Sequence, residues 1–358
     1  MTHPPTTQTI VILAAGDGTR MRSQTPKVLH ELAGRPMLRR ILDVTDELSV
    51  HQVCIVVAPH THAQIAATCG DTYTYVDQHE RRGTGHAVMQ SLSAMHAVDG
   101  DVIVLFGDTP LIQATTIQSV IADKHGHQAL VGVLSFDVPA PHNYGRIVRD
   151  DDGHVLAIVE AKNCTPAQQM IRESNSGIMV ISMAWLRQAL PRVTPNALTN
   201  EYYLTDLVAL AVADAGIGAV RAVVAADASD AYGVNDRIQL AEAERLLQAR
   251  TNQRLMAQGV TIVQPHSVLI APEVVIGQDC TIWPGSVITG STTIGAQSVI
   301  GPHTVIEHSV IGIQCNLPHC VVKHSTIQDM HTLAPFTVVM NRDSLPTDKE
   351  EARSHGIG

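Results

Sequence analysis

A glycine-rich segment near the N-terminus combines small residues with nearby positive charge. It reads Leu13-Ala14-Ala15-Gly16-Asp17-Gly18-Thr19-Arg20, and Lys27 follows it. Backbone amides without bulky side chains can approach a phosphate closely, and Arg20 and Lys27 would add two cations. The segment therefore predicts an anion site, with a plain turn and two surface charges as the alternative. It is not a P-loop, because no Gly-Lys-Ser/Thr closes it, and Met21 stands where a dinucleotide-binding loop has its third glycine.

A second group of chemically capable residues lies near the C-terminus. Its members are tetrahedral metal ligands by type: Cys315, His319, Cys320 and His324. Their surroundings, however, are a repeat in which alternate residues point inward, and single small cysteines suit inward positions. We favour packing over metal binding for this group.

The elements that must position the first segment are short strands alternating with helices. Between residues 8 and about 230 we expect strands at 9–14, 52–57, 101–106, 129–135 and 177–182, and helices such as 36–48 and 84–98. Such alternation predicts βαβ units and a mostly parallel sheet. The glycine-rich segment then lies at the carboxyl end of the first strand, in the crevice where such sheets bind ligands.

Two stretches depart from this alternation. Residues 146–160 form two alternating runs around Asp150-Asp151-Asp152-Gly153, which predicts a β-hairpin. Residues 207–226 are apolar enough to suggest a membrane span, but Asp214, Arg221 and two glycines interrupt them. A helix, a turn and a strand explain this second stretch better.

The last third of the chain repeats every six residues. Isoleucine recurs at positions 270, 276, 282, 288, 294, 300 and 306, and after a one-residue slip the pattern continues through Ile311, Leu317, Val322, Ile327, Leu333 and Val339. An α-helix has no such period. The pattern is typical of a left-handed parallel β-helix with three short strands per coil and one inward aliphatic side chain per hexad. A helix over 236–258 would lead into it.

Composition narrows the classes of function. The length of 358 residues predicts two domains, and 24 Lys+Arg against 34 Asp+Glu give a net charge of -10. That charge offers no general reason to bind nucleic acid or an anionic membrane, so a phosphate ligand must be held locally. Six scattered cysteines and an N-terminus without a basic and apolar leader indicate a reducing, cytoplasmic location.

Several motifs in register resemble one enzyme family. The run from Leu13 to Leu38 is similar to the opening of sugar-1-phosphate nucleotidyltransferases, and especially to the bacterial bifunctional N-acetylglucosamine-1-phosphate uridylyltransferase/glucosamine-1-phosphate acetyltransferase family. Further matches in the same order are Gln78 with Gly83-Thr84-Gly85-His86-Ala87, Gly107-Asp108, Tyr144-Gly145-Arg146-Ile147, Glu160, Asn175-Ser176-Gly177, Glu201 to Asp206 and Gly233-Val234-Asn235. The hexapeptide tail follows them as it does in that family, so the resemblance spans residues 9 to about 310.

The resemblance implies a role for each matching residue. Arg20, Lys27 and the loop that includes Leu13, Ala14, Ala15, Gly16 and Gly18 would hold the triphosphate of UTP and the departing pyrophosphate, while Asp108 and Asn235 would bind Mg²⁺. Gln78, Gly83 and Thr84 would read the uracil edge. Phe106 and Gly107 would border the sugar, and Gly145, Glu160 and Asn175 would orient its hydroxyl and acetamido groups. The attacking group is the sugar phosphate, which is largely ionised at pH 7, so no side-chain base is required.

Three departures from the family pattern affect the expectations. Phe106 replaces a tyrosine, which removes a hydroxyl near the sugar and leaves another sugar or base open as an alternative. Arg81-Arg82 replaces a Gln-Leu-like pair; it could touch phosphates, but we favour a solvated charge pair. Met340 replaces an arginine used in acetyl transfer, and the chain given ends at Gly358, before the family's acetyltransferase residues.

We therefore expect an α/β, Rossmann-like nucleotidyltransferase followed by a short left-handed parallel β-helix. The predicted parts are a nucleotidyltransferase domain at 1–235, a linker helix at 236–258, the β-helix at 259–345 and a flexible tail at 346–358. The predicted activity joins UTP to N-acetylglucosamine 1-phosphate for UDP-N-acetylglucosamine and peptidoglycan synthesis, without acetyl transfer. The β-helix would form a homotrimer. A non-catalytic subunit that binds sugar nucleotides is the alternative of another class.

Overall fold

The computed structural model describes residues 7–140 and 142–342, which form two compact units. The first unit comprises the described residues up to His30 together with Pro36–Leu240. The second comprises Glu31–Arg35 and the described residues from Ala241 onward. The division falls inside one long helix, α8 (Arg237–Ala257). The tail predicted at 346–358 lies outside the described residues.

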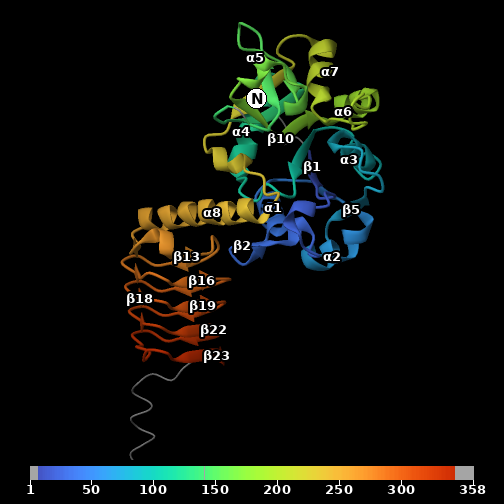
Figure 1. The fold of residues 1–358 in the computed structure, drawn as a ribbon. Helices are drawn as coiled ribbons and strands as arrows, with labels where there is room; N and C mark the ends of the chain where they lie inside the picture. Colours follow the sequence, from blue (N-terminus) through green and yellow to red (C-terminus); the bar gives the residue numbers. More distant parts are fainter. Residues whose placement is uncertain (1–6, 141, 343–358) are drawn as a thin grey trace, which may run out of the picture. The chain divides into compact units, whose positions relative to one another are not determined.

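The first unit is built on a mostly parallel sheet in the order β11-β7-β10-β6-β1-β4-β5 (Figure 1). Strand β10 is antiparallel to both of its neighbours, and the other pairs along this path are parallel. The strands are β1 (Gln8–Leu13), β4 (Gln52–Val57), β5 (Thr74–Asp77), β6 (Asp101–Phe106), β7 (Val131–Asp137), β10 (Glu173–Ser182) and β11 (Val220–Val224). The predicted α/β fold with a mostly parallel sheet is confirmed.

Helices cover both faces of this sheet, which is why its central strands are apolar on both sides. In β1, Ile10 and Ile12 join the core under α1, α2 and α4, whereas Val11 joins the core under α3, α6 and α7. The helices of the unit are α1 (Met37–Asp46), α2 (Pro59–Cys69), α3 (Thr84–Ser91), α4 (Ala114–Gly126), α5 (Pro166–Gln169), α6 (Met183–Ala189) and α7 (Asp206–Ala215). The 3-10 helices are η1 (Thr19–Met21), η2 (Lys27–Leu29), η3 (Ala161–Asn163), η4 (Leu190–Arg192) and η5 (Ala228–Ala231).

Helix α3 is shorter than the sequence pattern suggests. The prediction of a helix over 84–98 is wrong beyond Ser91, where α3 ends. The guanidinium of Arg187 donates to the carbonyl oxygens of Leu92 (3.4 Å), Met95 (2.9 Å) and Ala97 (2.9 Å). Because these carbonyls bond a side chain from α6 instead of amides of their own helix, the segment leaves the helical path.

The two irregular stretches take the predicted forms. Strands β8 (Arg146–Arg149) and β9 (Val155–Val159) pair antiparallel as a hairpin. Residues 207–226 fold as most of α7, a turn at Gly216 and β11. Among the residues that the structure describes, no helix is long and apolar enough to cross a bilayer.

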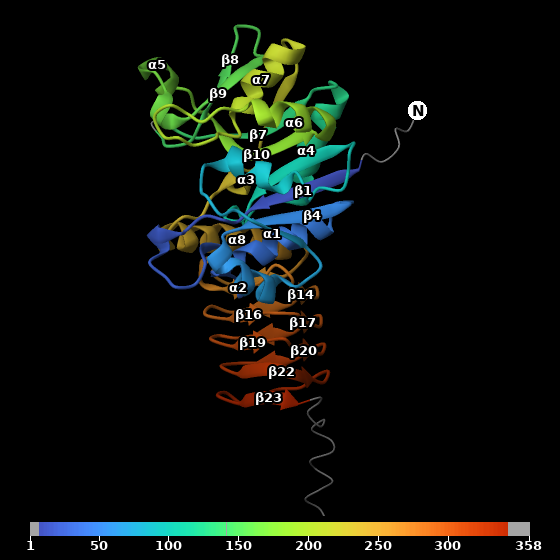
Figure 2. The ribbon, with the colours of Figure 1, turned by 90° about the vertical axis from the view of Figure 1, so that its right-hand side faces the viewer.

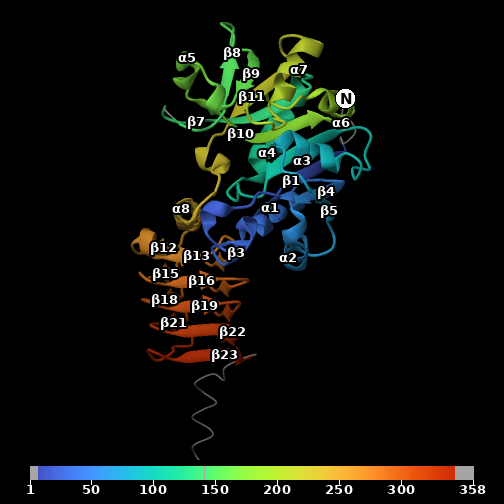
Figure 3. The same cartoon turned by 45° about the vertical axis from the view of Figure 1, so that its right-hand side comes forward.

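The second unit coils three parallel ladders into a β-helix, with one inward aliphatic side chain on each short strand and two, Val322 and Ile327, on the longer β22. Ile270, Ile288, Ile306, Val322 and Val339 stack along β13, β16, β19, β22 and β23, and all are nearly inaccessible to solvent (Figure 1). The second ladder joins β14, β17, β20 and the end of β22 (Figure 2), and the third joins β12, β15, β18 and β21 (Figure 3). The predicted hexapeptide β-helix is confirmed.

The strands of this unit are mostly two or three residues long, as the six-residue period requires. They are β12 (Thr261–Ile262), β13 (Leu269–Ile270), β14 (Val275–Ile276), β15 (Thr281–Ile282), β16 (Val287–Thr289), β17 (Thr293–Ile294), β18 (Val299–Ile300), β19 (Val305–Glu307), β20 (Val310–Ile311), β21 (Asn316–Leu317), β22 (Val321–Ile327) and β23 (Val338–Arg342). One 3-10 helix, η6 (Pro265–Ser267), precedes β13, and β2 (Glu31–Leu32) pairs with β3 (Arg35–Pro36).

The cysteines and histidines of the repeat lie in different environments. Cys315 and Cys320 are buried, and their thiols donate to the carbonyl oxygens of Gln328 and Pro318 at 3.0 Å. His324 is exposed at a corner of the coil and stacks on His308 with ring centroids 5.1 Å apart. His319 likewise stacks on His303, with ring centroids 5.8 Å apart, so the two cysteines and the two histidines lie in different environments.

Candidate active site

The glycine-rich segment leaves β1 where three parallel strands end together. The amide of Gly107, just after β6, donates to the carbonyl oxygen of Leu13 (2.9 Å), and the amide of Ala14 donates to Val56 in β4 (2.8 Å). Gly18 has a φ of 60°, and a Cβ there would lie 2.6 Å from the Cβ of Lys27. Glycine at this position therefore lets the backbone of the loop close against Lys27.

Lys27, Asp108 and Asn235 meet at the bottom of this loop. The Nζ atom of Lys27 donates to Oδ2 of Asp108 in an ion pair and to Oδ1 of Asn235 at 3.2 Å. The side chains of Lys27 and Asp108 are only 11% and 21% exposed. Two oxygen donors, one charged and one neutral, thus converge on a single cation in a largely buried setting.

Backbone hydrogen bonds bring Asn235 to this point from far along the chain. The amide of Val234 donates to the carbonyl oxygen of Asp108 (2.8 Å), and the amide of Asn235 donates to Oε1 of Gln239 in α8 (2.7 Å). The loop before α8 is therefore fixed to the end of β6. This contact determines the distance between the Asp108 carboxylate and the Asn235 amide.

A pocket of about 260 Å³ opens above these residues. Ten of the predicted substrate residues line it: Leu13, Ala14, Ala15, Gly16, Lys27, Gln78, Gly83, Thr84, Phe106 and Asp108. Val28, Arg81, Ala87 and Glu201 complete the lining. Residues from four separate parts of the chain thus share one cavity.

Gln78, Gly83 and Thr84 form one wall that is held by main-chain contacts. The Gln78 Nε2 atom contacts the carbonyl oxygen of Gly83 (3.3 Å) and Nδ1 of His86 (3.2 Å), which fixes the plane of the amide. The Oγ1 of Thr84 accepts from the amide of Leu204 at 3.1 Å. Gly83 has a φ of 96°, and a Cβ there would lie 2.6 Å from the carbonyl oxygen of Tyr202. The wall is therefore rigid before any ligand enters.

Gly145, Glu160 and Asn175 form a neighbouring cluster instead of lining the same pocket. A Cβ on Gly145 would lie 3.6 Å from both the Asn175 Cβ and the Glu160 Oε2. The Oδ1 of Asn175 accepts from the amide of Gly177 (2.9 Å), and a Cβ on Gly177 would lie 2.5 Å from the Phe106 ring. Phe106 therefore connects the pocket to this cluster.

Glu160 has a hydroxyl, a second carboxyl group and two cations near it, because Arg146 and Lys162 line the same cavity as Glu160. The hydroxyl of Thr205 donates to Oε1 of Glu160 at 3.1 Å. Burial raises the pKa of the adjacent Asp206, and the negative charge of Glu160 adds to the rise. The cluster thus offers hydrogen-bond acceptors in a partly desolvated setting, which suits a ligand rich in hydroxyl and amide donors.

Arg20 is placed differently from the other predicted catalytic residues. It lies in η1 (Thr19–Met21), is exposed, and stands outside the pocket lining. Gly107 also stands outside the lining, where its amide joins β6 to β1. The structure thus brings Lys27, Asp108 and Asn235 together and leaves Arg20 at the surface of the loop.

Arg81 and Arg82, interpreted from the sequence as a solvated charge pair, also contact residues that are distant in the chain, and the Arg81 side chain is 40% exposed. Arg81 lines the pocket and forms an ion pair with Asp17 of the glycine-rich loop. Arg82 lies over the ring of Tyr202, with its Cζ 4.9 Å from the ring centroid. The sequence pattern missed both contacts because their partners are distant in the chain.

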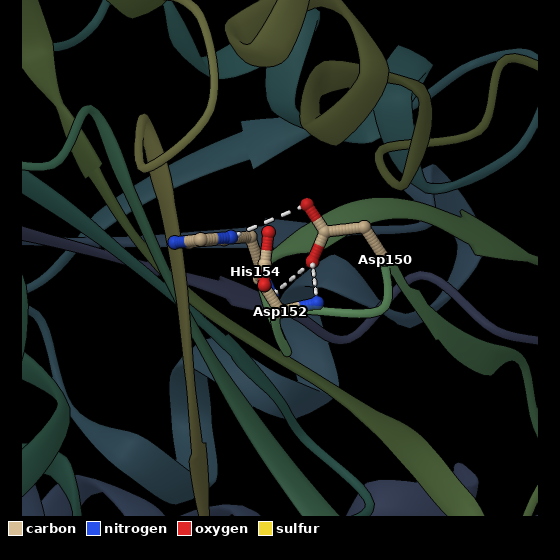
Figure 4. A group of neighbouring side chains, drawn as sticks. All are labelled: Asp150, Asp152 and His154. Carbon is tan, nitrogen blue, oxygen red and sulfur yellow. Dashed lines mark hydrogen bonds and ion pairs between the residues drawn. The ribbon is translucent and has the colours of Figure 1, made fainter.

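One other group of side chains has the spacing of metal ligands. Among the described residues, Asp150, Asp152 and His154 bring ligand atoms within 4.8 Å of one another at the β8–β9 turn (Figure 4). The Oδ1 of Asp150 accepts from the amides of Asp152 (3.1 Å) and His154 (2.7 Å). These bonds, led by that of the His154 amide, lower the pKa of Asp150. The group therefore serves to close the hairpin.

Comparisons with known proteins agree with both units. Residues 10–188 match the family described as MobA-like NTP transferase domain, and residues 273–308 match the bacterial transferase hexapeptide repeats. The chain is 40% identical to the bifunctional protein GlmU of Exiguobacterium sp. (strain ATCC BAA-1283 / AT1b), over 91% of this chain and 72% of that one. It is 42% identical to bifunctional protein GlmU of Geobacillus thermodenitrificans, over 91% and 70% of the two chains.

The fold and the site define a nucleotidyltransferase with a hexapeptide β-helix. Enzymes that transfer nucleotidyl groups use a divalent metal ion, and Asp108 and Asn235 supply the hard oxygen donors that such an ion prefers. The chain belongs to the bifunctional GlmU family.

Proposed function

We propose that the chain condenses UTP with N-acetylglucosamine 1-phosphate to give UDP-N-acetylglucosamine and pyrophosphate. The observation that carries this proposal is the convergence of Lys27, Asp108 and Asn235 under a glycine-rich loop at the edge of a parallel sheet. Positive charge, two oxygens of the kind that a divalent metal ion prefers and backbone amides that could hold a triphosphate together support the proposal. The product is a precursor for peptidoglycan synthesis.

Recognition of the base would fall to the wall formed by Gln78, Gly83 and Thr84. Because the Gln78 nitrogen is already held by Gly83 and His86, its carbonyl oxygen would accept from the N3–H of uracil. Cytosine lacks this N–H. The wall thus supports a preference for UTP over CTP.

Recognition of the sugar would fall to Phe106 and the cluster beyond it. Glu160 and the backbone around Gly145 and Asn175 would accept from sugar hydroxyls and from the acetamido N–H. The Phe106 ring would pack against the sugar without the hydroxyl that the family's tyrosine offers. A different sugar 1-phosphate therefore remains the second candidate substrate, and Phe106 is the observation that favours it.

The chemistry we propose is an in-line displacement at the α-phosphorus of UTP. A sugar phosphate oxygen attacks, the bond to the β-phosphate bridging oxygen breaks, and pyrophosphate leaves with that electron pair. A phosphomonoester has a second pKa of about 6, so the nucleophile is ionised at pH 7 without a base. Lys27 would offset the charge on the phosphates, and Arg20 would turn from the loop surface toward the leaving pyrophosphate.

Mg²⁺ is the metal that we propose for this site. Asp108 and Asn235 would hold it, with phosphates and water completing the shell, and Lys27 would then move from these oxygens to the triphosphate. When bound, the ion neutralises phosphate charge in the transition state. The contacts of the Lys27 Nζ atom with both oxygens support this proposal.

The β-helix would associate as a homotrimer, and the substrates point to a cytoplasmic location. Val275 and Val310 lie on one ladder of the prism and are 61% and 50% exposed, an arrangement that supports side-by-side packing. Sedimentation equilibrium of the whole chain tests the trimer, since a monomer at micromolar concentration would contradict it.

Met340 on β23 replaces the arginine used in acetyl transfer, so we propose uridylyl transfer alone.

The experiment measures pyrophosphate release with Mg²⁺ across a panel of sugar 1-phosphates and nucleoside triphosphates. We expect the highest kcat/KM with UTP and N-acetylglucosamine 1-phosphate, and a loss of at least about 100-fold in Asp108→Ala. Phe106→Tyr is expected to lower KM for the acetamido sugar. Release with no member of the panel would overturn the proposal, and release only with another sugar would favour the second candidate.

A further inference from the structure

Arg81 and Asp17 form an ion pair at the nucleotide pocket. Arg81 lies two positions before Gly83, and Asp17 lies between two glycines of the loop that leaves β1. Their side chains are 40% and 43% exposed. Exposed pairs of this kind contribute little to stability, so the fold has little need of this one.

Few charged side chains line the pocket, and Arg81 is one of them. Among the described residues that line it, the cations are Lys27 and Arg81. Lys27 bonds the oxygens of Asp108 and Asn235 at the bottom of the loop. Glu201, the other acid in the lining, contacts Lys162 at 3.3 Å. Arg81 is therefore the cation on the Gln78 to Gly83 side of the pocket.

An acidic residue inside a triphosphate loop is electrostatically unfavourable unless a cation accompanies it. UTP carries about four negative charges at neutral pH, and Asp17 would repel them at close range. A guanidinium that reaches the Asp17 carboxylate also reaches a phosphate lying on the adjacent amides of Gly16 and Gly18. Guanidinium binds phosphate oxygens through two parallel N–H donors, which a lysine cannot do.

We propose that Arg81 binds a phosphate of the nucleoside triphosphate directly. Asp17 is the partner that Arg81 leaves when it binds this phosphate. This inference rests on the proposed function, because it needs a triphosphate in the pocket. The pairing with Asp17 keeps the Arg81 guanidinium in place before the ligand arrives. When the triphosphate enters, Arg81 would exchange this carboxylate for a phosphate of higher charge. Phosphate recognition would then come from two sides, Lys27 below the loop and Arg81 beside it.

Arg82 provides a matched control. It is the same residue type at the next position, but it packs over Tyr202 and stands outside the pocket lining. Removing its charge alters the net charge of the protein by the same amount as removing that of Arg81. A difference between the two variants therefore reports position and not charge alone.

The test is calorimetric binding of UTP and of uridine to the full chain with Mg²⁺. We expect Arg81→Gln to weaken UTP binding about 10- to 100-fold, Arg82→Gln to change it less than about twofold, and uridine to bind all three proteins alike. Arg81→Lys should fall between wild type and Arg81→Gln. In steady state, Arg81→Gln should raise KM for UTP and leave KM for the sugar phosphate unchanged.

Asp17→Asn separates phosphate binding from a structural role. If Arg81 binds phosphate, removing its resting partner leaves UTP binding equal or tighter, which is the opposite of Arg81→Gln. Equal weakening by Asp17→Asn and Arg81→Gln would overturn the inference, because it would mean that the pair only shapes the loop. The inference would also be overturned if the wild type binds UTP and Arg81→Gln binds UTP equally well. Absence of UTP binding in the wild type would instead contradict the proposed function.

Discussion

The Nζ atom of Lys27 lies 3.2 Å from Oδ1 of Asn235, although the two residues are 208 positions apart in the chain. The same nitrogen forms an ion pair with Asp108, so one cation joins the loop after β1, the end of β6 and the segment before α8. This three-part junction is the physical basis for the metal and phosphate chemistry proposed above.

Asn235→Ala should weaken metal use more than it weakens protein stability. The substitution removes one of two proposed oxygen donors while Asp108 remains, so we expect the Mg²⁺ concentration for half-maximal rate to rise about tenfold. Saturating Mg²⁺ should restore much of the rate. A rate that is low but has an unchanged Mg²⁺ dependence would contradict a metal role for Asn235.

Gly83→Ala should impair UTP binding through a steric clash. A Cβ at this position would lie 2.6 Å from the Tyr202 carbonyl oxygen, which would push apart the wall that carries Gln78. Gly70→Ala is the control, since Gly70 has a φ of 95°, close to the 96° of Gly83, but open space around its Cβ position.

Both glycine variants carry the strain of a positive φ, about 1–3 kcal/mol in the free energy of unfolding. Only Gly83→Ala should also raise KM for UTP, by about tenfold. Urea unfolding and steady-state kinetics measure the two effects separately. The same KM in both variants would show that the contact with Tyr202 does not position the wall.

Ile288→Ala should destabilise the β-helix by about 2–5 kcal/mol, because it leaves a cavity inside the prism. Ile288 is fully buried between Ile270 and Ile306 on its ladder. Ile313→Ala makes the same chemical change at a position that is 47% exposed, and we expect less than about 0.5 kcal/mol there. In a Trp185→Phe background, Trp283 of this unit is the single tryptophan, and its fluorescence follows urea unfolding; equal midpoints would contradict the inward packing.

The cysteines should differ sharply in reactivity. Burial raises the pKa of Cys54 to about 11 and that of Cys69 to about 11, the latter against an opposing effect of Arg39. At pH 8 each is a thiolate on the order of one part in a thousand, and neither is accessible. Among the six free cysteines, only Cys164 is partly exposed, so Ellman's reagent should label one thiol readily in the native protein and six after denaturation.

The same shifts contribute to a loss of stability at alkaline pH. The folded-state pKa values of Cys54 and Cys69 lie above those of the unfolded chain, so the folded protein retains protons that the unfolded chain loses. The stabilisation is present in full below about pH 9 and is lost as pH rises toward 11. Double substitution of Cys54 and Cys69 by alanine should flatten this dependence in urea unfolding between pH 8 and 11. An unchanged slope would show that other groups determine the alkaline limit.

Local patterns were sufficient for most of the fold and part of the site. The six-residue period predicts the inward ladder from Ile270 to Val339, and the apolar runs predict β4 and β6 at their observed limits. The end of helix α3 was predicted wrongly, and the cause lies outside the local sequence. Its end depends on Arg187, which follows α3 by about ninety positions, and no local propensity carries that information.

The sequence alone determined the α/β class, the β-helix and the residue types available for nucleotidyl transfer, because these follow from periodicity and from motifs that are local in the chain. The tertiary structure decided which of those residues meet. It joined Lys27 to Asn235, placed Phe106 between the pocket and the Glu160 cluster, left Arg20 at the surface and paired Arg81 with Asp17. These contacts join residues that are far apart in the chain. The distances between them depend on where the parallel strands end and the loops return in the folded protein, which no local sequence pattern specifies.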